Sequence, residues 1–267
     1  MDFVQIFKNL IYAMLIGGSY YLPISYSEKK GILNLLITVY DDGIIMLIKG
    51  MGIIGASIAV IFLYRTRFNP LKTGENHFDI KLWKNIVFGS LPSMVAIVLF
   101  KSKESYLIGV RNVNYIIIII VAILFIITER LYKKNRIKGS KIIRIERVAL
   151  KNVLILGIIQ CVLLSFGISP VIGGMIGCWL IGVSTYSGIE YSLISSLCIY
   201  IINLLVSFLS LDAVLLNSEV ILTYLLVILV SFLMSLLTID LLIALGKKKS
   251  LRIFAFINLL IGVIYLF

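Results

Sequence analysis

Long apolar segments limit the fold of this 267-residue chain more than any other feature. A helix needs about 20 residues to cross a hydrocarbon core of about 30 Å. Six segments reach or approach that length: 43–64, 82–100, 113–128, 189–209, 220–245 and 253–267. Helices of this length satisfy their own backbone hydrogen bonds in lipid. We therefore expect an all-α polytopic membrane protein with a single integral membrane domain over residues 1–267.

The composition excludes a water-soluble fold and several kinds of chemistry. Hydrophobic residues make up 60% of the chain and charged residues 14%, which leaves too little polar surface to cover a soluble domain. The single His excludes chemistry built on several histidines. The three Cys are scattered through apolar segments without a CxxC pair, so we expect neither a disulfide framework nor a metal site.

Two further apolar stretches are interrupted and do not resemble simple spans. Residues 4–36 contain Gly17-Gly18 followed by Leu22-Pro23-Ile24-Ser25, and residues 153–181 contain Phe166-Gly167-Ile168-Ser169. Interrupted helices at matching positions in two halves indicate an inverted repeat with a binding site at the breaks. We expect two halves, about 1–137 and about 145–267. Each half would be a re-entrant helix hairpin followed by three transmembrane helices.

The excess of basic residues predicts the orientation of the chain. Lys and Arg number 25 against 13 Asp and Glu, a formal charge of +12, and they cluster at 65–84, 130–151 and 247–252. Such clusters lie on the cytoplasmic side of membrane proteins. All three fall on one side only if residues 153–181 are re-entrant, and both termini are then outside. The run 130–151 is expected to lie on anionic lipid, and no nucleic-acid partner is needed.

Helix breaks inside a membrane create an environment suited to anions. The N-terminus of a helix carries partial positive charge and presents N–H donors, so two such ends near the midplane favour a phosphate group. Candidate lining residues are hydroxyl-bearing or small: Ser25, Tyr26, Ser27, Ser169, Gly173 and Gly174. Lys29 follows the hydroxyl-rich turn and is a candidate phosphate contact. Alternatively, these serines and glycines only allow close helix packing.

The interrupted stretches resemble the two motifs of the undecaprenyl pyrophosphate phosphatase (bacitracin-resistance) family. Residues 17–27 resemble the motif Glu-Gly-x-x-Glu-Phe-Leu-Pro-x-Ser-Ser-Thr-Gly-His, and Gly157, Gln160, Cys161 and Gly167-Ile168-Ser169 resemble the other. The resemblance implies the inverted-hairpin fold and a place in the bacterial cell membrane. It also implies removal of phosphate from a C55 polyprenyl pyrophosphate by two glutamates, an arginine, serines and a divalent cation.

This chain departs from the family pattern at most of the residues that carry the chemistry. The two glutamates fall on Ile16 and Tyr20, the arginine on Pro170, the serine after it on Val171 and the histidine on Lys29. A Tyr-Arg pair of the last helix becomes Ile257-Asn258. The matching residues that remain are Ser25, Ser27 (for a threonine), Gln160 and Ser169.

Three functional interpretations follow. In the favoured one the hydrolytic centre is lost, and the chain binds or translocates a polyprenyl phosphate or pyrophosphate without a metal. The headgroup ligands would be Tyr20, Tyr26, Ser27, Lys29, Gln160, Ser169, Gly173 and Gly174. The second is an active diphosphatase with Ser25 as nucleophile, Lys29 as phosphate clamp and Tyr20 as acid, and with Mg or Ca if the family's activity is retained. The third is a non-enzymatic membrane partner or immunity protein. A homodimer is a candidate assembly for any of them.

Overall fold

The computed structural model describes residues 3–24, 42–68, 80–100, 111–134, 144–209, 218–248 and 251–264. The regular elements of these ranges are helices, which confirms the expected all-α class. They are α1 (Phe3–Tyr20), α3 (Asp42–Leu63), α4 (Arg65–Phe68), α5 (Ile80–Leu99), α6 (Arg111–Lys133), the 3-10 helix η1 (Ile145–Arg147), α7 (Leu150–Ser165), α8 (Pro170–Leu180), α9 (Thr185–Phe208), α10 (Ser218–Lys248) and α11 (Arg252–Ile264).

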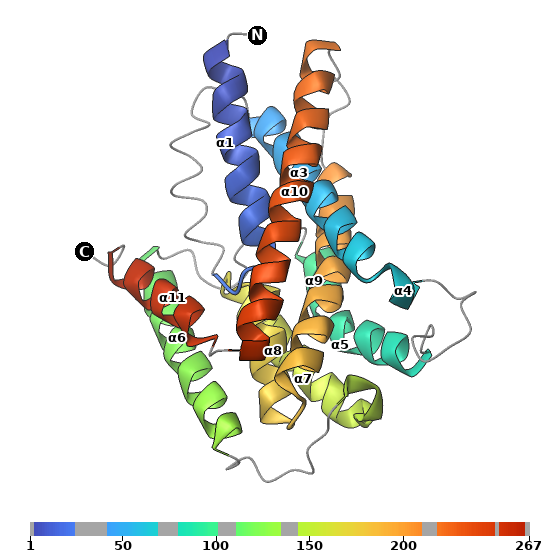
Figure 1. The fold of residues 1–267 in the computed structure, drawn as a ribbon, viewed down its shortest axis with the longest axis vertical. Helices are drawn as coiled ribbons and strands as arrows, with labels where there is room; N and C mark the ends of the chain where they lie inside the picture. The colour runs from blue at the N-terminus through green and yellow to red at the C-terminus, as the bar shows by residue number, and fades with distance from the viewer. Residues whose placement is uncertain are drawn as a thin grey trace.

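The helices are arranged around α9 and α10. The long helix α10 packs against α1 and α3, and α9 contacts α3, α5 and α8. Helices α7 and α8 form a hairpin that packs against α5 and α9, while α11 lies against α6 at one side of the molecule (Figure 1). The N-terminal helix α1 therefore reaches the C-terminal half of the chain through α10.

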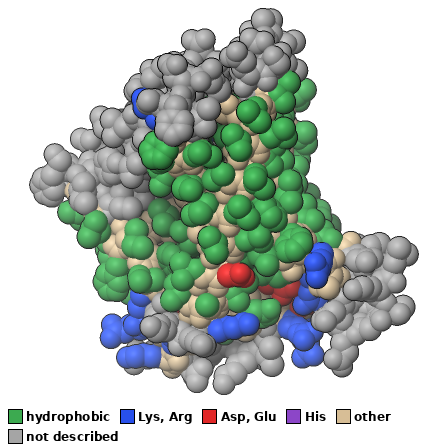
Figure 2. Space-filling model, turned by 45° about the horizontal axis from the view of Figure 1, so that its top comes forward, with side chains coloured by type: hydrophobic (Ala, Val, Ile, Leu, Met, Phe, Trp, Pro, Cys, Tyr) green, Lys and Arg blue, Asp and Glu red, His purple; other side chains and the backbone are tan. Residues whose placement is uncertain are grey.

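The surface of the bundle is that of a membrane protein. In the described part of the chain, three helical segments are long and apolar enough to cross a bilayer: Ile80–Leu99, Thr185–Phe208 and Ile221–Lys247. Exposed leucines recur every three or four residues along α10, at positions 222, 225, 229, 233, 237 and 241, and form an apolar stripe on one face of the helix. Figure 2 shows a broad apolar surface, with most of the visible Lys and Arg side chains gathered along its lower edge.

Helices α1 and α10 approach closely because small residues face hydroxyl groups between them. Ser231 Oγ of α10 donates to the carbonyl of Ala13 at 3.2 Å, and Ser235 Oγ donates to the carbonyl of Gly17 at 2.7 Å. A Cβ atom added to Gly17 would collide with the backbone of Ser231. Close backbone approach and interhelical hydrogen bonds are the main sources of helix association in lipid, so this seam holds α1 in place.

Four residues break the second interrupted stretch between α7 and α8. Gly167 has φ +77° and donates to the carbonyl of Leu164 at 2.8 Å, and Ile168 donates to the carbonyl of Leu163 at 3.1 Å. These two bonds form a Schellman motif, which ends α7 and requires a left-handed residue that glycine adopts at little cost. Ser169 is the N-cap of α8, and Pro170 occupies its first position.

The same arrangement recurs one helix later, between α8 and α9. Gly182 has φ +83° and donates to the carbonyl of Trp179, Val183 donates to the carbonyl of Cys178, and Ser184 caps α9 by accepting from the N–H of Ser187. The sequences at 166–169 and 181–184 thus break the chain twice in the same way. Each break supplies partners for amides and carbonyls that would otherwise be unsatisfied in a membrane.

The helix hairpin predicted at 153–181 is confirmed as two helices joined by a tight break. Its re-entrance, the inverted repeat and the halves 1–137 and 145–267 remain predictions. The first hairpin is described only as far as Ile24, and the return predicted up to residue 36 lies outside the described residues. The six predicted spans all coincide with helices, although α11 is described only to Ile264.

Two adjacent glycines test the α1–α10 seam. In Gly17→Ala the new methyl group meets the Ser231 backbone, so we expect a loss of about 1 to 3 kcal/mol in unfolding free energy. In Gly18→Ala the nearest side-chain atoms are 3.6 and 3.7 Å away, an ordinary contact, so stability should be unchanged or rise by up to about 1 kcal/mol. Thermal unfolding in detergent compares the two variants, and equal stability would contradict the seam.

Candidate functional site

The first helix break is held against α9 by one tyrosine. The hydroxyl of Tyr200 donates to the carbonyl of Tyr20, the last residue of α1, at 3.0 Å. The two rings make an edge-to-face contact with centroids 5.1 Å apart. These contacts fix the end of α1 to α9. A common binding site at the two interrupted stretches remains a prediction.

The positions expected to carry two glutamates are occupied by packed side chains at the end of α1. Ile16 is 4% exposed, and a Cβ atom on Gly52 of α3 would lie 2.6 Å from its Cγ2 atom. Tyr20 is also buried, and its hydroxyl makes a long contact of 3.5 Å to the carbonyl of Lys49. The Ile16 side chain therefore fills space between α1 and α3.

Gln160 of α7 reaches across to the start of α8. Its Nε2 atom donates to the carbonyl of Pro170 at 2.8 Å and to Ser195 Oγ of α9 at 3.2 Å. The side chain is fully buried, and its Oε1 atom has no hydrogen-bond partner among the described residues. Gln160 thus joins the start of α8 to α9. Its Oε1 atom is a buried acceptor beside the second break.

Ser169 satisfies the first turn of α8 from within the chain. Its hydroxyl accepts from the N–H of Val171 at 3.4 Å, and its carbonyl accepts from Ile172 at 3.0 Å and Gly173 at 3.3 Å. Pro170 has no N–H to offer. The N-terminus of α8 points its dipole into the site, while its first amides are already bonded to Ser169.

Gly173 and Gly174 allow α8 to pack closely against its neighbours. A Cβ atom on Gly173 would lie 3.0 Å from the Cα atom of Gln160, and one on Gly174 would lie 2.6 Å from Ser192 Oγ. Close packing, the alternative left open by the sequence, accounts for these contacts. A headgroup role for the two glycines remains a prediction.

Asn258 of α11 stands where the family pattern has an arginine. It is buried, and its Nδ2 atom donates to the carbonyl of Pro23 at 2.8 Å and to that of Phe254 at 2.9 Å. It therefore holds the first break against the last helix. Sequence reasoning did not assign a role to Asn258 or Tyr200. The polar face formed by Ser192, Ser196 and Tyr200 within an apolar span was the available signal for Tyr200.

Four predicted site residues, Ser25, Tyr26, Ser27 and Lys29, lie outside the described residues.

The remainder of the site does not fit a divalent cation. In the described ranges no three His, Cys, Asp or Glu side chains gather to hold a metal ion. Two buried carboxylates are engaged elsewhere: Glu190 pairs with Arg67 at 2.9 Å, and Glu129 accepts from the N–H of Leu251 at 2.9 Å.

The chain is similar to a family of bacterial membrane proteins over nearly its whole length. A family model described as bacitracin resistance protein BacA matches residues 9–264. A protein of Clostridium acetobutylicum named undecaprenyl-diphosphatase 2 is 26% identical, with 99% of this chain and 96% of the relative covered. Proteins named undecaprenyl-diphosphatase from Clostridium novyi (26% identical, 97% and 94% covered) and Psychrobacter cryohalolentis (28%, 100% and 96%) are also similar.

The hydroxyl of Tyr200 is expected to hold the first break against α9. Tyr200→Phe leaves the Tyr20 carbonyl without its donor, so unfolding free energy should fall by about 1 to 3 kcal/mol. The matched control is Tyr224→Phe in α10, because the Tyr224 hydroxyl is buried without a partner among the described residues. That variant should unfold at the temperature of the unmodified protein or slightly above it. An equal effect in both variants would mean that the Tyr200 hydroxyl does not hold the first break.

Proposed function

Because the chain belongs to the bacitracin resistance protein BacA family, we propose that it binds the phosphate or pyrophosphate headgroup of a polyprenyl lipid in the bacterial membrane. We propose further that it does so without hydrolysing the pyrophosphate. The absence of hydrolysis is supported by the packing of Ile16 and Pro170, which stand where the family pattern has a glutamate and the arginine.

Hydrolysis of a phosphoanhydride needs a group that handles protons and a group that neutralises the charge developing on the phosphates. The Ile16 side chain can neither take up a proton nor bind a metal. Pro170 offers only its carbonyl, which already accepts from Gln160. The two N–H bonds that an arginine side chain would donate to a phosphate have no counterpart at this position. The site as described supports binding better than hydrolysis.

Polar capacity remains beside the second break and on α9. Gln160 Oε1 and Ser196 Oγ are buried and have no hydrogen-bond partner among the described residues. Buried polar atoms without partners are rare in folded proteins, so a ligand group or a water molecule is expected to bond to them. Lys29 would add a positive charge for the phosphate, and the hydroxyls of Tyr20, Tyr26, Ser27 and Ser169 would complete the headgroup site beside Gly173 and Gly174.

We extend the same proposal to the inverted halves of the chain and its orientation in the membrane. With inverted halves 1–137 and 145–267, and all three basic clusters on the cytoplasmic side, both termini lie outside. Both hairpins then bring their breaks to a common site within the membrane. Inverted hairpins around one site suit alternating access, so translocation of the lipid is the extension of binding that we favour.

An active diphosphatase is the second candidate, favoured by the names of the relatives from Clostridium and Psychrobacter. In that case Ser25 would be the nucleophile, Lys29 the phosphate clamp and Tyr20 the acid. The hydroxyl of Tyr20 would have to turn from the Lys49 carbonyl toward the lipid. A non-enzymatic partner or immunity protein is the outcome that remains if neither binding nor turnover is found.

The deciding experiment uses purified protein with undecaprenyl pyrophosphate in the presence of Mg or Ca. We expect no phosphate release above the protein-free background, together with measurable binding of the lipid phosphate. Lys29→Ala should weaken binding about tenfold or more, because a charge-assisted hydrogen bond is lost. Lys8→Ala in α1 is the matched control and should bind as the unmodified protein does. Turnover that Ser25→Ala abolishes would contradict the proposal and establish the second candidate.

A further inference from the structure

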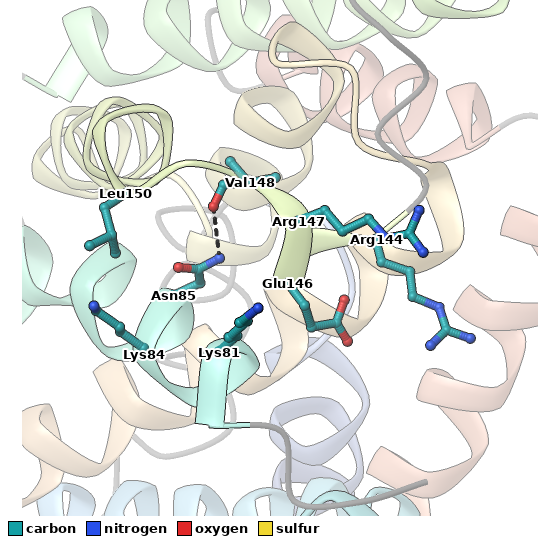
Figure 3. A pocket seen from close by; sticks show the side chains of 8 residues that line it. All are labelled: Lys81, Lys84, Asn85, Arg144, Glu146, Arg147, Val148 and Leu150. Carbon is teal, nitrogen blue, oxygen red and sulfur yellow. Dashed lines mark hydrogen bonds between the residues drawn. The ribbon is translucent and has the colours of Figure 1, made fainter. Parts of the chain in front are cut away.

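A cavity of about 560 Å³ opens at the end of α7 opposite to the break at 166–169 (Figure 3). The first turns of α5, the 3-10 helix η1 and the start of α7 form its walls. Four cationic side chains and one carboxylate line it, together with Asn85 and two apolar residues. The charged residues are Lys81, Lys84, Arg144, Arg147 and Glu146.

The walls of this basic pocket are held by buried hydrogen bonds. Asn85 Nδ2 donates to the carbonyl of Ile145 at 2.7 Å and to that of Val148 at 3.2 Å, which joins α5 to η1. The N–H of Ile145 donates to Ser187 Oγ of α9 at 3.0 Å. Ile145 and Val148 are buried, while Lys84 and Arg147 are exposed. The pocket is a preformed feature of the fold, with charged side chains around a fixed backbone.

The charge and hydrogen-bonding capacity of the pocket favour a phosphate group. Four cations against one carboxylate leave an excess of positive charge that an anion would neutralise. The N-cap residue of α7 is Ala149, which offers no side-chain cap, so the N-terminal amides and dipole of this helix also favour negative charge beside Leu150. Glu146 Oε2 is buried without a hydrogen-bond partner among the described residues. It requires a donor, such as a hydroxyl group carried by the same ligand.

The apolar surface next to the pocket identifies the ligand as a lipid. One to two turns further along α5, Val87, Phe88 and Leu91 are exposed, and on α7 Ile155 and Ile158 are exposed. Phe88 and Leu91 lie one and two turns after Lys84 on the same face of α5, so the apolar surface continues along this helix from the pocket. Cations at the end of an apolar band lie where phospholipid headgroups lie.

We propose that this basic pocket binds the headgroup of an anionic phospholipid, with the phosphate among its lysine and arginine side chains and a headgroup hydroxyl at Glu146. A glycerol headgroup meets both requirements. The site is separate from the break at 166–169, and it stands whether or not the protein binds a polyprenyl phosphate. A bound lipid would bridge α5 and η1 and fix the orientation of this end of the bundle in the membrane.

The test measures phosphatidylglycerol binding to the full chain by native mass spectrometry and by titration with a fluorescent analogue in detergent. The double variant Lys84→Gln/Arg147→Gln removes one lysine and one arginine from opposite walls of the pocket. Arg130→Gln/Lys134→Gln is the matched control, because it removes one arginine and one lysine from exposed positions in the last turn of α6 and directly after it. We expect the pocket variant to bind at least tenfold more weakly and the control to stay within about twofold.

Three outcomes would overturn the proposal. Unchanged affinity in the pocket variant would exclude the site, and an equal loss in both double variants would assign the binding to general surface charge. Full competition by millimolar inorganic phosphate or glycerol 3-phosphate would show that the pocket binds the free anion instead of a lipid. If the pocket variant alone melts at a lower temperature, Lys84→Arg separates loss of folding from loss of the charge. This variant keeps the charge and should keep the affinity for the lipid.

Discussion

The fold depends on the requirement that every backbone amide and carbonyl released by a helix break within lipid finds a partner inside the protein. The chain meets it at 166–169 and again at 181–184 with a left-handed glycine, a β-branched residue and a capping serine. At the first break, the carbonyls of Tyr20 and Pro23 accept from Tyr200 and Asn258, which belong to distant helices. The breaks are therefore points where α1, α8, α9 and α11 are joined.

The same requirement shapes the chemistry that the site supports. Ser169 and the Pro170 carbonyl are engaged in completing the second break, and Asn258 is engaged at the first. Pro170 and Asn258, which stand where the family pattern has arginines, thus hold the backbone. What remains for a ligand is a small set of buried polar atoms, including Gln160 Oε1, and the hydroxyl-rich segment after Ile24. This division between structural and ligand-binding groups underlies the proposed loss of hydrolysis.

Much of this architecture was predictable from sequence because hydrophobic length and helix-break residues are local signals. The six helical segments and the break at Gly167-Ile168-Ser169 follow from them. The roles of Tyr200 and Asn258 did not, because they depend on which distant carbonyl each side chain reaches in the packed bundle. The basic pocket was not predictable from the sequence either. Its lysines and arginines belong to two sequence clusters that the packing of α5 against α7 and the Asn85 hydrogen bonds bring together.

Phosphorus NMR of undecaprenyl pyrophosphate bound to the purified protein with Mg present tests the proposed loss of hydrolysis most directly. A single sample reports both binding and chemistry. We expect the two pyrophosphate resonances to shift and broaden on binding and then to persist for hours without a monophosphate signal. Conversion of the bound lipid to undecaprenyl phosphate and free phosphate, in proportion to the protein present, would contradict it.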